Sequence, residues 1–416
     1  MITTVISCSS NITGVMDDRI RSLCHLYLGW NKDQIMVRPL GKGCTNNVII
    51  ASLNEDLGSE VRQRNQSLVR DGIDGLCKDN NNEHQVDHYE QVKDHEGFLG
   101  DYDCNRVENE NEFKKVTKEV LVKLYGSVIP GKLATDVYVN CYLGSLGRVP
   151  KILGLFEGGR IEEFLPSTCI THDNFRLQYR KIVKMTMEFQ NLSMPVPREI
   201  FLVKQLREFS ERVTEDKEFW KAEVDWFLDI LDKIGSDLQL SFCHNDVSMN
   251  NLLVPNSEPD NLVLIDWEYA SFNYSLYDIA NYCCQLQYDL SHPVAPYFLF
   301  NDQWLPCDAV LLDVLNIYKT STSPPNPTPY MELLAQLKFM IMGSELFWTL
   351  WALTLEVSFN IDLTDYLAAK RNGYFQKKEL YADVIAELVA EKSFEKSADS
   401  PQYAIKESSI REELIY

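Results

Sequence analysis

Three oxygen-bearing side chains, Asp246, Asn251 and Asp266, have types and spacing that suit phosphoryl transfer. Asp246 and Asn251 lie in the segment Phe242–Val254, and Asp266 ends an apolar run about fifteen residues after the asparagine. Phosphoryl transfer needs a carboxylate that orients or deprotonates the attacking hydroxyl, and oxygen ligands that hold Mg²⁺ on the phosphates. Asp246 fits the first task, whereas Asn251 and Asp266 fit the second.

The same residues also have a purely structural interpretation. Asp246 could belong to an Asx turn, and Asp266 could cap a short helix that follows a strand. Each feature alone favours that interpretation, but the full order H-x-D-x4-N, apolar strand, Asp favours a kinase-type site. We expect His244 to brace this loop through hydrogen bonds, because phosphoryl transfer does not require a second base here.

The front of the chain supplies candidates for binding a nucleotide. The glycine-rich turn Gly41–Asn46 can bring backbone N–H groups close to phosphates. Lys123 lies in a predicted strand from which it could reach the α- and β-phosphates, with a solvated lysine at a strand edge as the alternative. A cation in that place usually needs an acidic partner on the following helix, and Asp136 is available.

The elements that must position these residues predict an α+β chain with two lobes. Strands are predicted at 36–40, 47–51, 120–125, 152–156 and 160–165. Helices are predicted from residue 132 and at 174–191, 199–214, 217–235 and 331–357, with a hairpin formed by 252–254 and 262–265. A small antiparallel-sheet lobe that binds the nucleotide (1–166) would precede a larger helical lobe for catalysis and substrate binding (167–416), with the nucleotide between the two lobes.

Residues 54–112 interrupt the strand region with an acidic segment that has little apolar periodicity. Such a segment cannot bury enough apolar surface to offset the entropy of ordering it, which predicts a disordered insertion in a hairpin connection. Its three histidines, His84, His88 and His95, could suggest metal capture, but chance is the favoured explanation in a flexible acidic loop.

The overall charge disfavours whole classes of function. The chain has 61 acidic and 40 basic residues and a formal charge of −21, which disfavours binding to nucleic acid or anionic lipid. No secretory signal is expected at the start, and the apolar run 337–357 contains Lys338 and Glu345, which predicts a buried helix without membrane insertion. The eleven cysteines form no CxxC pair, so reduced thiols in the cytoplasm are expected.

The catalytic segment resembles the choline/ethanolamine kinases, a branch of the protein-kinase-like superfamily that also contains the aminoglycoside phosphotransferases. The resemblance rests on FCHNDVSMNNLLV (242–254) and LIDWEYASFNYSLYDIANYCC (264–284). It extends to VLVKLYG (120–126), PKILGLF (150–156), GRIEEFLP (159–166), FWTLWA (347–352) and YLAAKRNGYF (366–375). It covers residues 35–392 apart from the acidic insertion, and it implies the bilobal protein-kinase-like fold.

The resemblance also implies roles for individual residues. Asp246 would be the catalytic base, Asn251 and Asp266 would bind the metal, and Glu268 would support the metal site. Nucleotide binding is implied for Gly43, Thr45, Asn46, Lys123, Asp136, Glu163 and Leu165. Substrate binding is implied for Asp246, Ser248, Gln285, Trp348, Trp351, Tyr366 and Tyr374. Lys123 and Asp136 stand where the family usually has Arg and Glu, which alters the geometry of that cation–carboxylate pair.

A quaternary ammonium has no N–H to donate, so choline would be held by aromatic faces and carboxylates. For the pair Trp348 and Trp351 core packing is the alternative, but the matching motif favours binding. Four positions depart from the choline-binding pattern of the family, namely Gln285, Leu290, Ile361 and Leu363, and these admit ethanolamine. The segment 288–298 is closer to the choline branch.

The resemblance therefore implies ATP- and Mg²⁺-dependent phosphorylation of the hydroxyl of choline to phosphocholine, which is the first step of phosphatidylcholine synthesis by the CDP-choline route. Ethanolamine is the alternative acceptor. Two further alternatives are a kinase for another amine such as an aminoglycoside, and a pseudokinase that uses its acidic insertion for docking. Members of the family are often dimers, so a homodimer is also to be tested.

Overall fold

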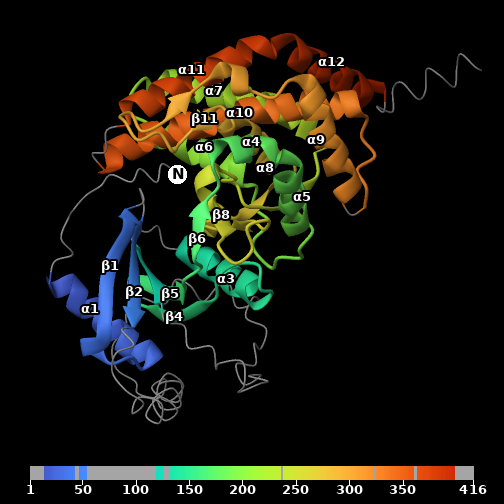
Figure 1. Ribbon diagram of the computed structural model, residues 1–416. Coiled ribbons are helices and arrows are strands. Elements are labelled where there is room, and N and C mark those ends of the chain that lie inside the picture. Colours follow the sequence, from blue (N-terminus) through green and yellow to red (C-terminus); the bar gives the residue numbers. More distant parts are fainter. Residues whose placement is uncertain are drawn as a thin grey trace, which may run out of the picture. The chain divides into compact units, whose positions relative to one another are not determined.

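The computed structural model describes residues 14–42, 46–53, 119–125, 132–235, 238–322, 324–359 and 363–398 (Figure 1). These residues form two compact units. The sheet unit contains the described residues up to 125 together with 150–165, and the helical unit contains 132–149 and 166–398. The predicted acidic insertion and its histidines lie outside the described residues, as do Gly43, Thr45 and Ile361.

The sheet unit is built on a five-stranded antiparallel sheet. Its strands are β1 (Ile35–Lys42), β2 (Asn46–Leu53), β3 (Glu119–Tyr125), β4 (Ile152–Phe156) and β5 (Gly159–Glu163), in the spatial order β1-β2-β3-β5-β4. The predicted strands are thus confirmed, except that β5 ends at Glu163 instead of Leu165. The residues before and after the acidic segment belong to directly paired strands, since Ser52 pairs with Glu119.

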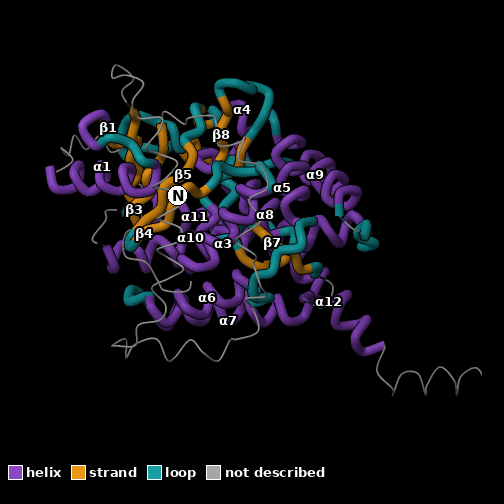
Figure 2. The backbone as a smooth tube through the Cα atoms, turned by 90° about the horizontal axis from the view of Figure 1, so that it is seen from below, coloured by secondary structure: helices purple, strands orange, loops and turns teal. Residues whose placement is uncertain are grey.

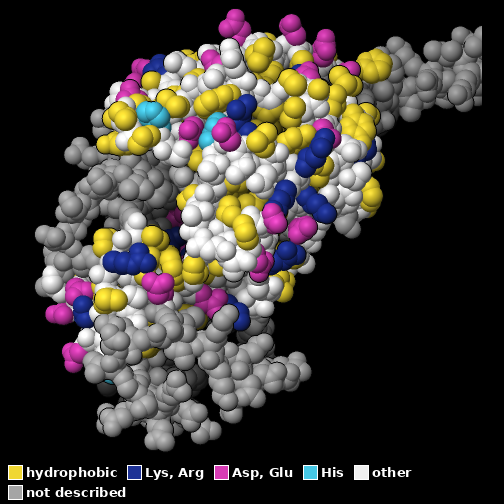
Figure 3. All heavy atoms as spheres, in the orientation of Figure 1, with side chains coloured by type: hydrophobic (Ala, Val, Ile, Leu, Met, Phe, Trp, Pro, Cys, Tyr) yellow, Lys and Arg dark blue, Asp and Glu magenta, His cyan; other side chains and the backbone are white. Residues whose placement is uncertain are grey.

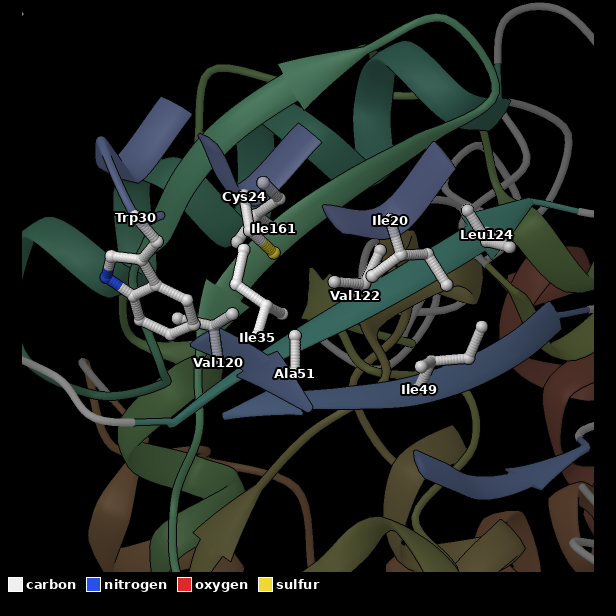
Figure 4. Packing of buried hydrophobic residues seen from close by; sticks show 10 residues of the cluster. All are labelled: Ile20, Cys24, Trp30, Ile35, Ile49, Ala51, Val120, Val122, Leu124 and Ile161. Atoms are coloured by element: carbon white, nitrogen blue, oxygen red, sulfur yellow. The ribbon is translucent and has the colours of Figure 1, made fainter. Parts of the chain in front are cut away.

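One face of this sheet is covered by helix α1 (Gly14–Leu28), which the sequence analysis did not predict. Figure 4 shows Ile20 and Cys24 of α1 among the buried side chains of the strands. Alternate residues of β3 enter this core because successive side chains of a strand point to opposite faces. They are Val120, Val122 and Leu124.

Lys123 therefore lies on the opposite face of β3 from the α1 core. It is only 7% exposed, and its strand runs between β2 and β5. The alternative of a solvated lysine at a strand edge is consequently wrong. The residue paired with Lys123 on β5 is Arg160, which is 2% exposed, forms an ion pair with Glu162 and donates from Nη1 to the hydroxyl of Tyr125 at 3.3 Å.

The helical unit contains most of the helices. They are α3 (Lys132–Ser145), α4 (His172–Leu177), α5 (Tyr179–Gln190), α6 (Phe201–Arg212), α7 (Lys217–Ile234), α8 (Tyr277–Gln285), α9 (Asp308–Ser321), α10 (Tyr330–Phe359), α11 (Thr364–Leu380) and α12 (Ala382–Ala398). Helix α3 groups with this unit, so the division into compact units differs from the expected boundary at 166/167. The division into a nucleotide-binding and a substrate-binding lobe stays a prediction.

Helix α10 forms the centre of the helical unit and packs against α6, α8, α9, α11 and α12. Its side chains are buried nearly all round from Leu333 to Leu355, as expected for a helix that is apolar on every face. Figure 2 shows α6 and α7 lying side by side, in agreement with their direct packing. Within the described ranges, the structure has no helix that is both long and apolar enough to span a bilayer.

Short strands frame the loops of the helical unit. Strand β8 (Leu252–Pro255) pairs with both β6 (Ser167–Cys169) and β9 (Val263–Leu264), while β7 (Leu240–Cys243) pairs with β10 (Ser271–Tyr274) and β11 (Tyr288–Asp289) pairs with β12 (Leu299–Phe300).

On the outer face, basic and acidic side chains alternate over α5 and α9 (Figure 3), where Arg180 forms a 2.7 Å ion pair with Asp313.

Candidate active site

The loop that follows β7 is held by one buried carboxylate on α8. Asp278 is 1% exposed, and its two oxygens accept the backbone N–H groups of His244 at 3.0 Å and Asn245 at 2.7 Å. The side-chain amide of Gln190 donates a third hydrogen bond at 3.2 Å. Burial raises the pKa of Asp278, while His244 and these hydrogen bonds oppose the rise. The carboxylate thereby fixes the backbone just before Asp246.

Asp246 and Asn251 are directly linked across this loop. The amide nitrogen of Asn251 donates to the carboxylate oxygen Oδ2 of Asp246 at 2.8 Å and to its backbone oxygen at 2.9 Å. Asp246 is 0% exposed and Asn251 is 3% exposed. These bonds use the nitrogen of the amide, so the oxygen of Asn251 is the atom with which it would bind a cation. The carboxylate of Asp246 is thus held by the side chain of Asn251.

His244 ties the same loop to the residue before Asp266. Its Nδ1 accepts the N–H of Asp246 at 3.1 Å, so its Nε2 carries the proton and donates to the backbone oxygen of Ile265 at 3.0 Å. The backbone N–H of Ile265 in turn donates to the backbone oxygen of Asn251 at 2.9 Å. Both ring nitrogens of His244 are thus engaged by backbone, as expected for a bracing histidine.

Asp266 has a left-handed backbone, with φ of 66°, and Asn245 has a similar φ of 67°. This conformation is unfavourable for residues other than glycine and is found preferentially at functional sites. The short turn of helix after Asp266, residues Trp267–Tyr269, receives no capping hydrogen bond from its side chain. The interpretation of Asp266 as a simple helix cap is therefore wrong.

Tyr269 lies among the carboxylates of this region. Burial raises the pKa of its hydroxyl well above the usual value, and the negative charges of Glu268, Asp246 and Asp266 add to the effect, while a hydrogen bond from Trp351 opposes it. The indole N–H of Trp351 donates to the Tyr269 hydroxyl at 2.9 Å. The charges of three acidic side chains therefore act on one buried tyrosine that is hydrogen-bonded to α10.

The two tryptophans of α10 belong to a continuous aromatic cluster. Their ring centroids are 5.3 Å apart, and the ring of Tyr366 lies 6.3 Å from that of Trp351. Trp348 is 0% exposed and donates from its indole nitrogen to Asn281 at 2.7 Å. Asn281 also donates to the backbone oxygen of Val247 at 3.3 Å, which connects the cluster to the loop that follows β7.

Three other predicted substrate residues are all buried, but in different surroundings. Ser248 lies in the catalytic loop at 0% exposure and Gln285 lies at the end of α8 at 3% exposure. The hydroxyl of Ser248 has no hydrogen-bond partner in the described part of the chain. Tyr374 belongs to a separate cluster, because its hydroxyl donates to Glu223 at 2.6 Å and its ring packs against Trp220 and Phe375.

The predicted nucleotide-binding residues lie in both units. Asp136 is 4% exposed on α3, where it accepts from the amide of Asn140 at 2.8 Å. The carboxylate of Glu163 accepts the backbone N–H of Lys151 at 3.0 Å. Lys123 and the strand residue Asn46 lie in the sheet unit, and Leu165 follows β5. The pairing of Lys123 with Asp136 stays a prediction.

Several residues of the site were not singled out from the sequence. Asp278 and Asn281 lie on successive turns of α8, while Asn245 bonds through its side chain to the backbone oxygen of Tyr269 at 2.8 Å and to the amide of Asn273 at 2.8 Å. All of them lie within the two motifs that carry the family resemblance. These residues were therefore visible within the motifs, but their role is to hold the backbone in place, and the spacing of residues in the sequence does not reveal such a role.

Comparison with known proteins agrees with this arrangement. The family model described as choline/ethanolamine kinase matches residues 103–375. The chain is 27% identical over 310 residues to choline kinase alpha of Mus musculus, covering 66% of this chain and 65% of that protein, slightly less than two thirds of its length. It is also 27% identical over 291 residues to a choline/ethanolamine kinase of Mus musculus, covering 63% of this chain and 73% of the relative.

A solved structure supports the fold. The choline kinase of Cryptosporidium parvum superposes with a TM-score of 0.63 at 20% identity, covering 88% of this chain and 96% of the other. This likeness confirms the predicted α+β class, a protein-kinase-like fold with a small antiparallel sheet and a mainly helical part. The family match spans well over half of the sequence, and the chain therefore belongs to the choline/ethanolamine kinase family.

Proposed function

We propose that the chain catalyses ATP- and Mg²⁺-dependent phosphorylation of the hydroxyl of choline, with phosphocholine as the product and with ethanolamine as the alternative acceptor. This would be the first step of phosphatidylcholine synthesis by the CDP-choline route. The observation that carries the proposal is the link between Asp246 and Asn251, because it joins a buried carboxylate to an amide whose oxygen suits a cation.

Asp246 would accept the proton of the acceptor hydroxyl or orient that hydroxyl for attack. The amide of Asn251 holds carboxylate oxygen Oδ2, so the group is fixed in position before any substrate arrives. Asp278 and His244 would act indirectly, since they hold the backbone on either side of the loop. A fixed carboxylate in a buried setting is the arrangement that proton transfer at a bound hydroxyl requires.

The donor set fits magnesium. Asn251 and Asp266 offer amide and carboxylate oxygens, which are the hard ligands Mg²⁺ prefers, and Glu268 follows two residues later. Among the described residues, no group of three or more His, Cys, Asp or Glu could hold a metal. A magnesium ion shared between two protein ligands and the nucleotide phosphates needs no such group. When bound, it would neutralise charge on the transferring phosphoryl group.

The acceptor ammonium would lie against the aromatic cluster of Trp348, Trp351 and Tyr366. Aromatic faces attract cations without needing N–H donors, which suits a trimethylated nitrogen. Tyr269 connects this cluster with the acidic residues, so the ammonium and the hydroxyl of one small amino alcohol could be recognised together. The neutral Gln285 supplies no negative charge, and this keeps ethanolamine as the alternative.

The test is the variant Asp246→Asn. It preserves shape but removes the base, and we expect turnover with choline to fall by at least about 10³-fold, while ATP affinity measured by calorimetry changes less than about threefold. Asn261→Ala, in the exposed turn before β9, is the matched control and should keep wild-type turnover. Undiminished turnover in Asp246→Asn would overturn the assignment.

The acceptor is identified by comparing kcat/KM for choline, ethanolamine and an aminoglycoside under identical ATP and Mg²⁺ concentrations. We expect choline to give the highest value. Preference for ethanolamine would select the alternative, and failure to consume ATP with any amino alcohol would support the pseudokinase. Location in the cytoplasm and assembly as a homodimer form part of the same proposal, and sedimentation of the purified chain tests the second of these.

A further inference from the structure

A fully buried ion cluster joins α10 to α11. The carboxylate of Glu345 on α10 lies 3.2 Å from the ammonium of Lys370 and 2.9 Å from that of Lys377, both on α11. The side chains of Glu345 and Lys370 are 0% exposed, and that of Lys377 is 3% exposed. One carboxylate therefore faces two ammonium groups away from water, which leaves one positive charge in excess when all three are ionised.

The sequence of α11 explains this close approach. Lys370, Gly373 and Lys377 lie three and four residues apart, so they occupy one face of the helix. A Cβ atom at Gly373 would lie 3.1 Å from Oε1 of Glu345, which is tighter than side chains usually pack. Burial raises the pKa of Glu345, but the two lysines outweigh it and hold the pKa below its ordinary value. The carboxylate is thus ionised.

Lys370 extends from this cluster to the aromatic residues. Its ammonium lies 3.6 Å from the ring centroid of Tyr288 and 5.7 Å from that of Tyr366. Tyr366 is the residue whose other ring neighbour is Trp351, at 6.3 Å. Burial lowers the pKa of Lys370, while the carboxylate of Glu345 at 3.2 Å opposes this shift and, together with the aromatic faces, stabilises the charged ammonium.

We propose that Lys370 determines specificity by placing a positive charge of the protein itself beside the aromatic cluster that receives the acceptor. This inference rests on the proposed function, because it concerns the affinity of the same site for a cation. The ammonium of Lys370 lies against the ring of Tyr288 and approaches the ring of Tyr366, so a cationic acceptor must bind near a like charge. The positive charge of Lys370 accordingly reduces the preference of the site for ammonium compounds over neutral alcohols of the same shape.

The size of the effect follows from Coulomb's law. Two unit charges about 9 Å apart at an effective dielectric constant of about 20 interact strongly enough to change an affinity by roughly twentyfold, and partial screening reduces this to about fivefold. Removing the positive charge should therefore tighten the binding of choline, and removing the negative charge of Glu345 should weaken it. A neutral acceptor of the same shape should respond to neither change.

The experiment measures choline and its neutral isostere 3,3-dimethylbutan-1-ol with the full chain. The KM of choline and the inhibition constant of the isostere against choline are determined at saturating ATP. Lys370→Met keeps the volume of the side chain and should lower the KM for choline about fivefold, whereas Glu345→Gln should raise it by a similar factor. Both variants should leave the inhibition constant of the isostere within about twofold.

Lys338→Met is the matched control. Lys338 lies on α10, forms a 2.8 Å ion pair with Asp308 and places its ammonium 5.6 Å from the ring centroid of Tyr381. Its replacement removes the same kinds of contact elsewhere, so the KM for choline should not change. Thermal melting of each variant shows whether it is folded at the assay temperature.

The opposite signs of the two expected shifts keep the proposal falsifiable if one variant does not fold. Equal shifts for choline and the isostere would identify a purely structural role and overturn the proposal. An unchanged KM for choline in a folded Lys370→Met or Glu345→Gln variant would also overturn it. A wild-type chain that phosphorylates neither choline nor ethanolamine would instead show that the proposed function is wrong.

Discussion

The indole N–H of Trp351 donates a buried hydrogen bond to the hydroxyl of Tyr269, with 2.9 Å between the nitrogen and the oxygen. This bond connects the long central helix α10 with the short turn that follows Asp266, so residues about 80 positions apart in the sequence share one contact. Core packing and the proposed acceptor binding are compatible for Trp351, because its indole N–H holds Tyr269 while its ring also contacts that of Trp348, with the centroids 5.3 Å apart.

Replacing Trp351 by Phe tests this connection. The aromatic face remains, but the Tyr269 hydroxyl loses its buried donor, and we expect a loss of about 1–2 kcal/mol in the free energy of unfolding. The KM for choline should rise about fivefold because the cluster is no longer held against the acidic residues, while the KM for ATP stays unchanged. Steady-state kinetics and chemical denaturation measure both effects. Trp226→Phe on α7 is the control, and equal changes in the two variants would contradict the prediction.

Replacing Asp278 by Asn should damage the catalytic loop without touching a substrate. The carboxylate accepts two backbone N–H groups, and an amide offers one acceptor and brings a competing donor. We expect a loss of about 2–4 kcal/mol in the free energy of unfolding and a fall of at least about 100-fold in kcat. Denaturant titration and single-turnover assays check this. A folded variant with wild-type kcat would show that Asp278 does not position Asp246.

Replacing Asn251 by Ala should separate the metal requirement from the rest of the reaction. The variant loses the amide oxygen assigned to magnesium and both hydrogen bonds to Asp246. We expect kcat to fall by about 100-fold and the Mg²⁺ concentration for half-maximal activity to rise about tenfold. A magnesium titration at fixed ATP measures the shift. An unchanged magnesium dependence would remove Asn251 from the ligand set.

The buried cysteines should resist alkylation in the folded protein. Burial raises the pKa of Cys24 to about 12 and that of Cys284 to about 12, the latter with a contribution from the charge of Glu345. At pH 8 the thiolate fraction of such groups is about 10⁻⁴, so iodoacetamide should modify exposed Cys141 and Cys307 first. Peptide mass mapping before and after unfolding shows which cysteines iodoacetamide has modified. Rapid labelling of Cys284 in the native protein would contradict it.

The sequence predicted the strands, the main helices and the family, because each depends on a local pattern, while the catalytic roles of the motif residues stay predictions. It did not predict α1, whose partly polar segment becomes a helix by packing Ile20 and Cys24 onto the sheet. The sequence left open whether Lys123 is solvated, because the exposure of a strand residue depends on which strands lie beside it. Strand β5, which covers one edge of β3, comes later in the chain. The anchoring role of Asp278 was likewise hidden, because its partners are backbone N–H groups.

The buried charges of α10 and α11 show the same limit. Glu345 was visible in the sequence only as an interruption of an apolar run, and Lys370 was not singled out, because the two residues lie 25 positions apart in the chain. Packing of two helices decides whether such a charge faces water or another charge. Under the proposal made above, the substrate preference of the site depends on these contacts, which a local sequence pattern does not reveal.

The pairing of Ser52 with Glu119 has a consequence for how this protein can diverge. Two positions that face each other across neighbouring strands can be joined by a stretch of almost any length, and doubling that length costs only about 0.6 kcal/mol of closure entropy. Homologous chains can therefore gain or lose dozens of residues at this point while every hydrogen bond of the sheet keeps its register. An expression variant with residues 54–118 exchanged for a tight turn is accordingly a natural starting material for crystallisation.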